Sequence, residues 1–219
     1  MPHMTIIQCH VIDSYAPENL NSDRDGFSKD THYGGAMRAR ISNQCAKRAV
    51  RKSDEFQNAI QGMIAIRTKQ LIPRLIEELV EKGVDRQWAE QHAPRLVSGV
   101  PLDKKRRALY AQRASQEDGE FETNVLLYIS RSEIDELLNQ LAEWGSRSES
   151  PEDAELKQWV RNFSKRKAGR TSAAEIALFG RMLPDNPQQD IFAACSVDDA
   201  YSTHPVKTAD VDFFTAVDD

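Results

Sequence analysis

Between residues 55 and 100 the apolar residues recur at spacings of three and four, which is the period of an amphipathic helix. Gly83 suits the position that follows a helix end. Residues 132–144 show the same period, with Ser132 as the expected N-cap. Residues 154–167 form a further helix candidate that is rich in Lys and Arg. The pattern predicts a largely helical middle of the chain.

Short runs rich in β-branched and aromatic residues predict strands at residues 5–15 and 124–130. Residues 37–41 are expected to form a short strand, and residues 176–182 a strand that runs into a loop. Residues 16–35 are rich in Pro, Asn, Asp, Ser and Gly and predict a long loop. Strands on both sides of a helical stretch indicate the α+β fold class.

The composition is that of an ordinary soluble protein, with 40% hydrophobic and 29% charged residues among 219. That length suits one large domain or two small ones. No apolar run is long enough to cross a membrane, and the first residues lack the pattern of a signal peptide. The three cysteines are far apart and form neither a disulfide framework nor a CxxC site. A cytoplasmic location is the simplest expectation.

The formal net charge of -5 conceals a strong segregation of charge along the chain. Residues 28–52 hold seven Lys and Arg against one Asp, and residues 157–170 hold six Lys and Arg without an acid. Residues 185–219 hold eight Asp against one Lys. A basic stripe on an acidic protein indicates that a polyanion binds at one face, although solvated helix faces would give the same pattern.

The first basic stretch predicts a helix that ends near Lys52, with Ser42 or Asn43 as its N-cap. Lys47 and Arg51 lie four residues apart and share a face of this helix, and Arg48 lies beside them. The start of a helix carries a partial positive charge and free N–H groups, which suit a phosphate.

Further donors flank the helix start. Gln44 adds a neutral donor, as does Ser42, while Arg38 and Arg40 alternate along the preceding strand and project to one side. Together these residues form a track that would bind a phosphodiester backbone without sequence preference. Residues 34–35, both Gly, either allow close backbone approach or form a plain turn.

The chain offers little to an enzyme. It contains no HExxH, GxSxG, Walker A or GxGxxG motif, and His10 is expected to be packed or hydrogen-bonded. Asp218 and Asp219 could bind a metal but fit surface charge better. Arg181 and Met182 could present a guanidinium to phosphate and a thioether to a base, although the residues alone favour Met182 as a filler of a core gap.

Several ordered motifs resemble the CasC family, the repeated backbone subunit of the type I-E CRISPR Cascade complex. They are His10-Val11-Ile12, Asn19-Leu20-Asn21-Ser22-Asp23, Tyr33-Gly34-Gly35, Arg38 to Ala49, IALFGRMLPDNP at residues 176–187, and STHPVKTADVDFFTAVDD at residues 202–219.

The resemblance implies a palm that is similar to an RNA-recognition motif (ferredoxin-like), with an inserted helical domain and a β-hairpin thumb. The corresponding ranges are the first part of the palm at 1–54, a helical insertion at 55–123, the second part of the palm at 124–200, and the start of a thumb, apparently truncated, at 201–219.

The resemblance also implies a function without catalysis and without a cofactor. Copies of the subunit polymerise as a helical filament along a CRISPR RNA (crRNA), together with other Cascade subunits, and the guide then pairs with target DNA. The residues expected to contact RNA are Ser42, Gln44, Lys47, Arg48 and Arg51, with Arg38 and Arg40 in the basic track, Lys29 as a weaker match, and Arg181 and Met182 at the RNA face, where Met182 would pack against a base.

The chain departs from the family pattern in places. Asn43 and Cys45 replace usual serines, and Ser22 replaces a usual Arg. The family continues after the last motif, so an interaction protein without activity, which caps the filament, is one alternative. The other is a metal-dependent ribonuclease like the type III backbone subunits, with Asp23, Asp25 or Asp30 as the candidate acid.

Overall fold

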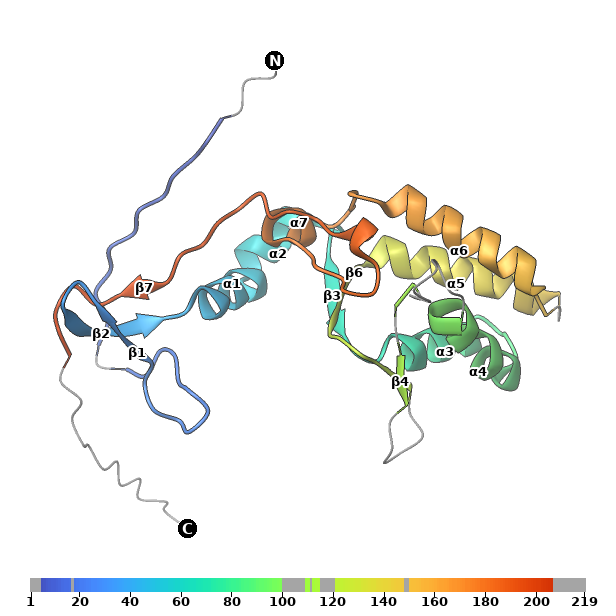
Figure 1. Ribbon diagram of the computed structural model, residues 1–219, viewed down its shortest axis with the longest axis horizontal. Helices are drawn as coiled ribbons and strands as arrows, with labels where there is room; N and C mark the ends of the chain where they lie inside the picture. Colours follow the sequence, from blue (N-terminus) through green and yellow to red (C-terminus); the bar gives the residue numbers. More distant parts are fainter. Residues whose placement is uncertain are drawn as a thin grey trace, which may run out of the picture. The chain divides into compact units, whose positions relative to one another are not determined.

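The computed structural model describes residues 5–16, 18–99, 109–110, 112–114, 121–147 and 150–206. The chain forms two compact units. The first holds the described residues up to Arg48 together with those from Val197 onward, and the second holds the described residues between Ala49 and Ser196. Figure 1 labels helices and strands of both units.

The first unit contains three strands and the start of a helix that continues into the second unit. These are β1 (Asp30–Tyr33), β2 (Ala36–Ile41), β7 (Ala200–Tyr201) and α1 (Asn43–Lys52). The elements that lie wholly in the second unit are α2 (Asp54–Ile60), β3 (Ala65–Thr68), α3 (Leu71–Glu81), α4 (Arg86–Pro94), the π-helical turn η1 (Arg95–Gly99), β4 (Gln112–Ala114), β5 (Phe121–Thr123), β6 (Leu127–Ser130), α5 (Arg131–Ser146), α6 (Asp153–Lys167), α7 (Ala174–Phe179) and the 3-10 turn η2 (Pro187–Gln189).

The first unit is built on an antiparallel sheet with the order β1-β2-β7. Gly34 and Gly35 join β1 to β2, with Tyr33 paired to Ala36 and φ angles of 62° and 79° at the two glycines. Positive φ at both central residues defines the tight hairpin turn that favours Gly-Gly. A Cβ on Gly35 would meet nothing within 4 Å, so the turn, rather than a close approach, explains this pair.

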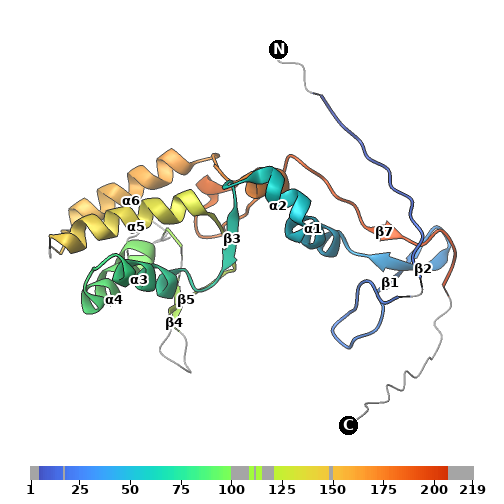
Figure 2. The same ribbon diagram turned by 180° about the vertical axis from the view of Figure 1, so that it is seen from behind.

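The core of the second unit lies among α3, α4, α5, α6 and β6, and Figure 2 shows α5 and α6 side by side. Trp144 of α5 meets Trp159 of α6 edge to face, and Trp159 stacks on Phe163. The fully buried aliphatic side chains from these helices and from β6 include Leu71, Leu75, Leu79, Ile129, Ile134, Leu137, Leu141 and Val160.

A strand interrupts the stretch that was predicted to be helical from residue 55 to residue 100. Strand β3 pairs with β6 in antiparallel register, so that Ala65 lies opposite Ser130 and Thr68 opposite Leu127. Because β6 is buried along its whole length, it offers a partner that only the tertiary structure provides. The prediction of helix is wrong at β3 and holds for α3, which ends before Gly83 as predicted.

Helix α5 begins two residues earlier than predicted, because Ser130, rather than Ser132, is its N-cap. The Ser130 Oγ accepts from the Glu133 backbone N–H at 3.2 Å, and the Glu133 carboxylate accepts from the Ser130 backbone N–H at 2.8 Å. This reciprocal pair is a capping box, which satisfies two backbone donors at the helix start.

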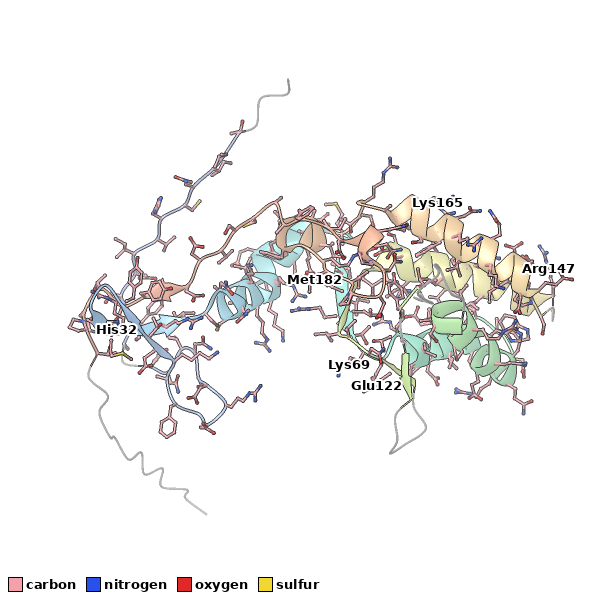
Figure 3. The ribbon with its side chains drawn as sticks, in the orientation of Figure 1. His32, Lys69, Glu122, Arg147, Lys165 and Met182 are labelled. Carbon is pink, nitrogen blue, oxygen red and sulfur yellow. The ribbon has the colours of Figure 1, made fainter. Side chains whose placement is uncertain are left out.

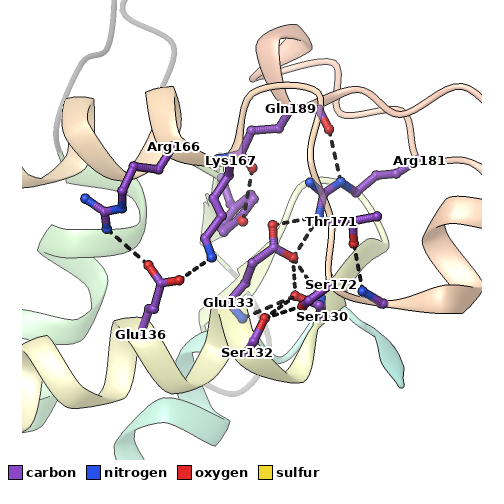
Figure 4. Close-up of polar contacts among 12 residues, drawn as sticks. Ser130, Ser132, Glu133, Glu136, Arg166, Lys167, Thr171, Ser172, Arg181 and Gln189 are labelled. Carbon is purple, nitrogen blue, oxygen red and sulfur yellow. Dashed lines mark hydrogen bonds and ion pairs between the residues drawn. The ribbon is translucent and has the colours of Figure 1, made fainter. Parts of the chain in front are cut away.

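The same carboxylate holds Arg181 in the interior (Figure 4). Arg181 Nη1 lies 2.9 Å and 3.0 Å from the two Glu133 oxygens, and each side chain is 1% exposed. Arg181 also donates to the carbonyl oxygens of Gln189 and Tyr128. One buried carboxylate therefore joins the start of α5 to the loop that follows α7.

Residues 174–179 form helix α7 and not the strand predicted for 176–182. The helix ends at Gly180, whose φ is 78°, and an added Cβ would lie 3.0 Å from the Ile191 carbonyl oxygen. After this turn Arg181 makes a single antiparallel bridge with Ile191. The apolar run was too short to separate a helix from a strand by its period alone.

The strand predicted for residues 5–15 is not formed. Its apolar side chains are exposed, with values of 83% for Ile7 and 89% for Ile12, and His10 is exposed as well rather than packed. A strand needs a neighbour for its backbone groups, and no described residue pairs with this segment.

The α+β class is confirmed, because the structure contains both helices and small antiparallel sheets. Within the described ranges no helix is both long and apolar enough to span a bilayer. The start of the thumb was expected at 201–219, and from residue 207 onward it lies outside the described residues, as do Asp218 and Asp219.

The buried ion pair gives a prediction for stability. Glu133→Gln leaves the buried Arg181 guanidinium without a counter-charge, so we expect the free energy of unfolding to fall by roughly 3–5 kcal/mol. Urea denaturation followed by circular dichroism measures it. The matched control is Glu143→Gln on the same helix, since Glu143 is exposed and, among the described residues, pairs only with Arg147. Equal losses in the two variants would contradict this account.

Candidate nucleic-acid interface

Arg38 and Arg40 of β2 both bind oxygen atoms inside the first unit. Arg38 donates to the carbonyl oxygens of Tyr33 at 3.0 Å and Ser202 at 2.8 Å. Arg40 Nε lies 2.7 Å from the Asp199 carboxylate. The two arginines do belong to one short stretch of sheet, as predicted, but they brace β1 and β7, and the charge of Arg40 is offset by Asp199.

Ser42 is only 3% exposed, so its hydroxyl is not offered to a ligand. Its backbone N–H and its Oγ both donate to Asn21 Oδ1, each at 2.9 Å. The same Oγ accepts weakly from the Cys45 N–H at 3.4 Å, which is the position of an N-cap. Ser42 therefore ties the loop before β1 to the start of α1, and its expected contact with RNA is replaced by a structural role.

The expected phosphate position at the start of α1 is already filled. The Asp199 carboxylate accepts from the Asn43 backbone N–H at 2.7 Å. An acidic side chain at a helix start takes the place that a phosphate would occupy. The contact at the helix start thus stabilises the first unit, and the Asn43 N–H is not available to a phosphate.

The exposed polar face of α1 carries the residues that remain available. Gln44 and Arg48 are exposed, and Lys47 is half-buried. Within the described part of the chain neither Lys47 nor Arg48 makes an ion pair. Lys29 is also half-buried, and its carbonyl oxygen accepts from the Arg40 N–H. These cations are free to neutralise phosphates.

Arg51 belongs to the second unit, where a buried carboxylate holds it. Its Nη2 lies 3.5 Å from Glu175 Oε2, and its side chain is 17% exposed. Its guanidinium carbon lies 4.9 Å from the centre of the Tyr128 ring. Spacing places Arg51 on the face of α1 that carries Lys47. Most of its surface is nevertheless covered.

Arg181 and Met182 point to opposite sides of the loop after α7. Arg181 is 5% exposed and bound to Glu133, so the structure removes it from the residues that were expected to face RNA. Met182 is 78% exposed and labelled in Figure 3, so it does not fill a core gap. Residues alternate in extended backbone, and burying Arg181 therefore turns Met182 outward.

The acidic loop residues do not assemble a metal site. The Asp23 carboxylate accepts from the backbone N–H groups of Asp25 and Phe27 and so shapes its own loop. Asp30 is the first residue of β1. No group of three or more metal-ligating side chains occurs among the residues that the structure describes.

Sequence reasoning missed three residues that organise these sites: Asn21, Asp199 and Glu175. Each acts across more than a hundred residues of sequence or from a loop, so no local period marks it. For Asp199 and Glu175 the sequence shows only that acids are present. It does not specify which acid meets which cation.

Among the described residues Lys47 and Arg48 of the basic helix α1 make no ion pair, whereas Arg51 of the same helix is paired with Glu175. The sequence matches the model of the CT1975-like protein family over residues 7–219, and the chain belongs to that family. The family resemblance inferred from the motifs is thereby confirmed. No curated protein matches the chain.

Two similar solved structures support the fold. One, named "CRISPR RNA-guided surveillance complex", has a TM-score of 0.69 at 26% identity over 87% of this chain. Another, named "CRISPR RNA-guided surveillance complex, pre-nicking", has a TM-score of 0.69 at 30% identity over 92% of this chain. The chain spans 56% and 53% of those chains, which is a little more than half of their length.

The Asn21 contact gives a second prediction. Asn21→Ala leaves the buried Ser42 backbone N–H without its acceptor, which costs about 1–3 kcal/mol of unfolding free energy. Thermal unfolding, monitored by circular dichroism, measures the loss. Asn19→Ala is the matched control, because the Asn19 side chain donates to the Gly26 carbonyl oxygen in an exposed hydrogen bond, its only side-chain bond to a described residue. A control as damaging as Asn21→Ala would show that Ser42 does not depend on this acceptor.

Proposed function

We propose that the protein is a crRNA-binding backbone subunit of a type I-E CRISPR surveillance complex. The observation that carries the proposal is the pair of uncompensated cations, Lys47 and Arg48, on the accessible face of α1. The similar solved structures are named as CRISPR RNA-guided surveillance complexes, which supports a guide RNA as the polyanion. Other subunits of the complex are then its partners, and a cytoplasmic location is expected.

The cations would bind the RNA backbone and leave the bases free. Lys47 and Arg48 neutralise phosphates, and the exposed amide of Gln44 adds a neutral donor. Contacts of this kind carry no sequence information, so guides of any sequence can be held. Copies of the subunit would polymerise along the guide, which then reads target DNA by base pairing.

Met182 supplies the contact to a base. Met182 is 78% exposed, and leaving its apolar side chain in water is unfavourable in free energy. The flat face of a base is suited to cover it. The buried Arg181 acts as an anchor that fixes the backbone beside Met182. The exposed thioether would pack against the face of one base.

Removing the free cations tests the proposal. The double variant Lys47→Ala/Arg48→Ala should bind single-stranded RNA more weakly, and the slope of log affinity against log salt should fall by roughly 1.4, about 0.7 for each lost phosphate contact. Fluorescence anisotropy with labelled RNAs of two unrelated sequences measures both quantities. The two sequences should lose affinity to the same extent.

The matched control is Lys82→Ala/Lys157→Ala, which removes the same charge from exposed positions on other helices. If the control loses as much RNA affinity as the α1 variant, the effect comes from net charge alone. If the unaltered chain binds no RNA at any salt concentration, the proposal fails and an interaction protein without RNA contact becomes the better reading.

We also propose that the subunit has no catalysis of its own. Incubation of the chain, in complex with guide RNA, with a paired target RNA and Mg²⁺ should leave the target intact on a denaturing gel. The shape of the 21–29 loop depends on Asp23, which is occupied by backbone donors rather than poised for a metal. Cleavage that Asp23→Ala abolishes would favour the ribonuclease alternative.

A further inference from the structure

Two guanidinium groups in the second unit lie against one aromatic ring. The guanidinium carbon of Arg51 is 4.9 Å from the centre of the Tyr128 ring, and that of Arg67 is 5.3 Å from it. Arg67 lies on β3 directly opposite Tyr128 on β6, so strand pairing sets this contact. Cations at such distances are attracted to the negative face of the ring.

Among the described residues one carboxylate, that of Glu175, is bound in this cluster, and its oxygens already have partners. Glu175 is 3% exposed, and its Oε1 accepts from Gln57 Nε2 at 3.2 Å. Its Oε2 accepts from the Tyr128 hydroxyl at 3.1 Å and lies 3.5 Å from Arg51. Burial raises the pKa of the Tyr128 phenol, so the hydroxyl stays neutral and keeps donating to Glu175.

Arg67 is therefore the cation that has no counter-charge. It is exposed, and it makes no ion pair or hydrogen bond within the described parts of the chain. Glu175 offsets Arg51 alone, which leaves the cluster with a net positive charge. Two like charges beside one ring repel each other, and an anion that reaches Arg67 relieves that repulsion.

The geometry points to Arg67 as a further RNA-binding residue, which takes one backbone phosphate on its outer edge while the Tyr128 ring holds its guanidinium in place. This inference rests on the proposed function, since it adds a phosphate contact in the second unit to those made by α1. A planar guanidinium can offer two parallel N–H groups to one phosphate.

The ring also explains why an exposed arginine would bind well here. A free Arg loses rotamer freedom when it captures a phosphate, whereas a guanidinium already packed on a ring loses less. Tyr128 is thus a positioning residue, and Arg51, which also lies against its ring, is held by Glu175. The cluster presents one free cation in a defined place.

The test is Arg67→Gln in the full chain, titrated with single-stranded RNA at several salt concentrations. We expect roughly tenfold weaker binding and a salt slope lower by about 0.7. Arg67→Lys, which keeps the charge but not the planar fork, should restore the slope and only part of the affinity. A merely structural role for Arg67 would not separate slope from affinity in this way.

Lys82→Gln is the control. Lys82 is an exposed cation that directly follows α3, about 16 Å along the helix axis from the start of α3. Tyr128→Phe, which keeps the ring, should leave the salt slope unchanged. An Arg67→Gln slope equal to that of Lys82→Gln, while Lys47→Ala/Arg48→Ala still weakens binding, would overturn this inference and leave the proposed function standing. Absence of RNA binding by the unaltered chain would remove both.

Discussion

Burying a carboxylate is costly unless its oxygens are hydrogen-bonded and its charge is paired. The partners that Glu133 recruits organise much of the second unit. Its oxygens receive the Ser130 N–H and hydroxyl and the Arg181 guanidinium, with both charged side chains almost wholly removed from water. Such a pair contributes little net stability over an apolar pair, but leaving either member alone is costly. The start of α5 and the loop after α7 are therefore held together, and Met182 is turned outward as a consequence.

The same reasoning separates the cations of the two units into those that have a counter-charge and those that do not. Arg40 is paired to Asp199, Arg51 to Glu175 and Arg181 to Glu133, so each of these mainly supports the fold. Lys47 and Arg67 have no such partner in the described part of the chain. A positive charge that is already balanced inside the protein gains little from a phosphate, because it would have to give up its own carboxylate. The cations without an internal partner are therefore the ones that we propose as RNA contacts.

Much of the fold followed from the sequence. The periodic segments gave α3, α5 and α6, because a long amphipathic pattern admits few alternatives. The Gly34-Gly35 turn and the helix beginning after Ser42 followed from local backbone chemistry. The predictions failed where a segment was short or depended on a distant partner. Residues 5–15 have no partner strand among the described residues, residues 65–68 have one in β6, and residues 174–179 became a helix.

By itself the sequence determined which residues are cationic, where the basic helix runs, and, through its ordered motifs, the family to which the chain belongs. Only the tertiary structure decided which of those cations are available. Asn21, Asp199, Glu133 and Glu175 reach their partners across long stretches of chain, and their pairing depends on packing that no local pattern encodes. Charge is a property of a residue, whereas an unpaired charge is a property of its surroundings. That difference places Ser42 and Arg181 in the interior framework. It leaves Lys47, Arg48 and Arg67 without an ion pair among the described residues and Met182 exposed, and these are the residues that we propose as RNA contacts.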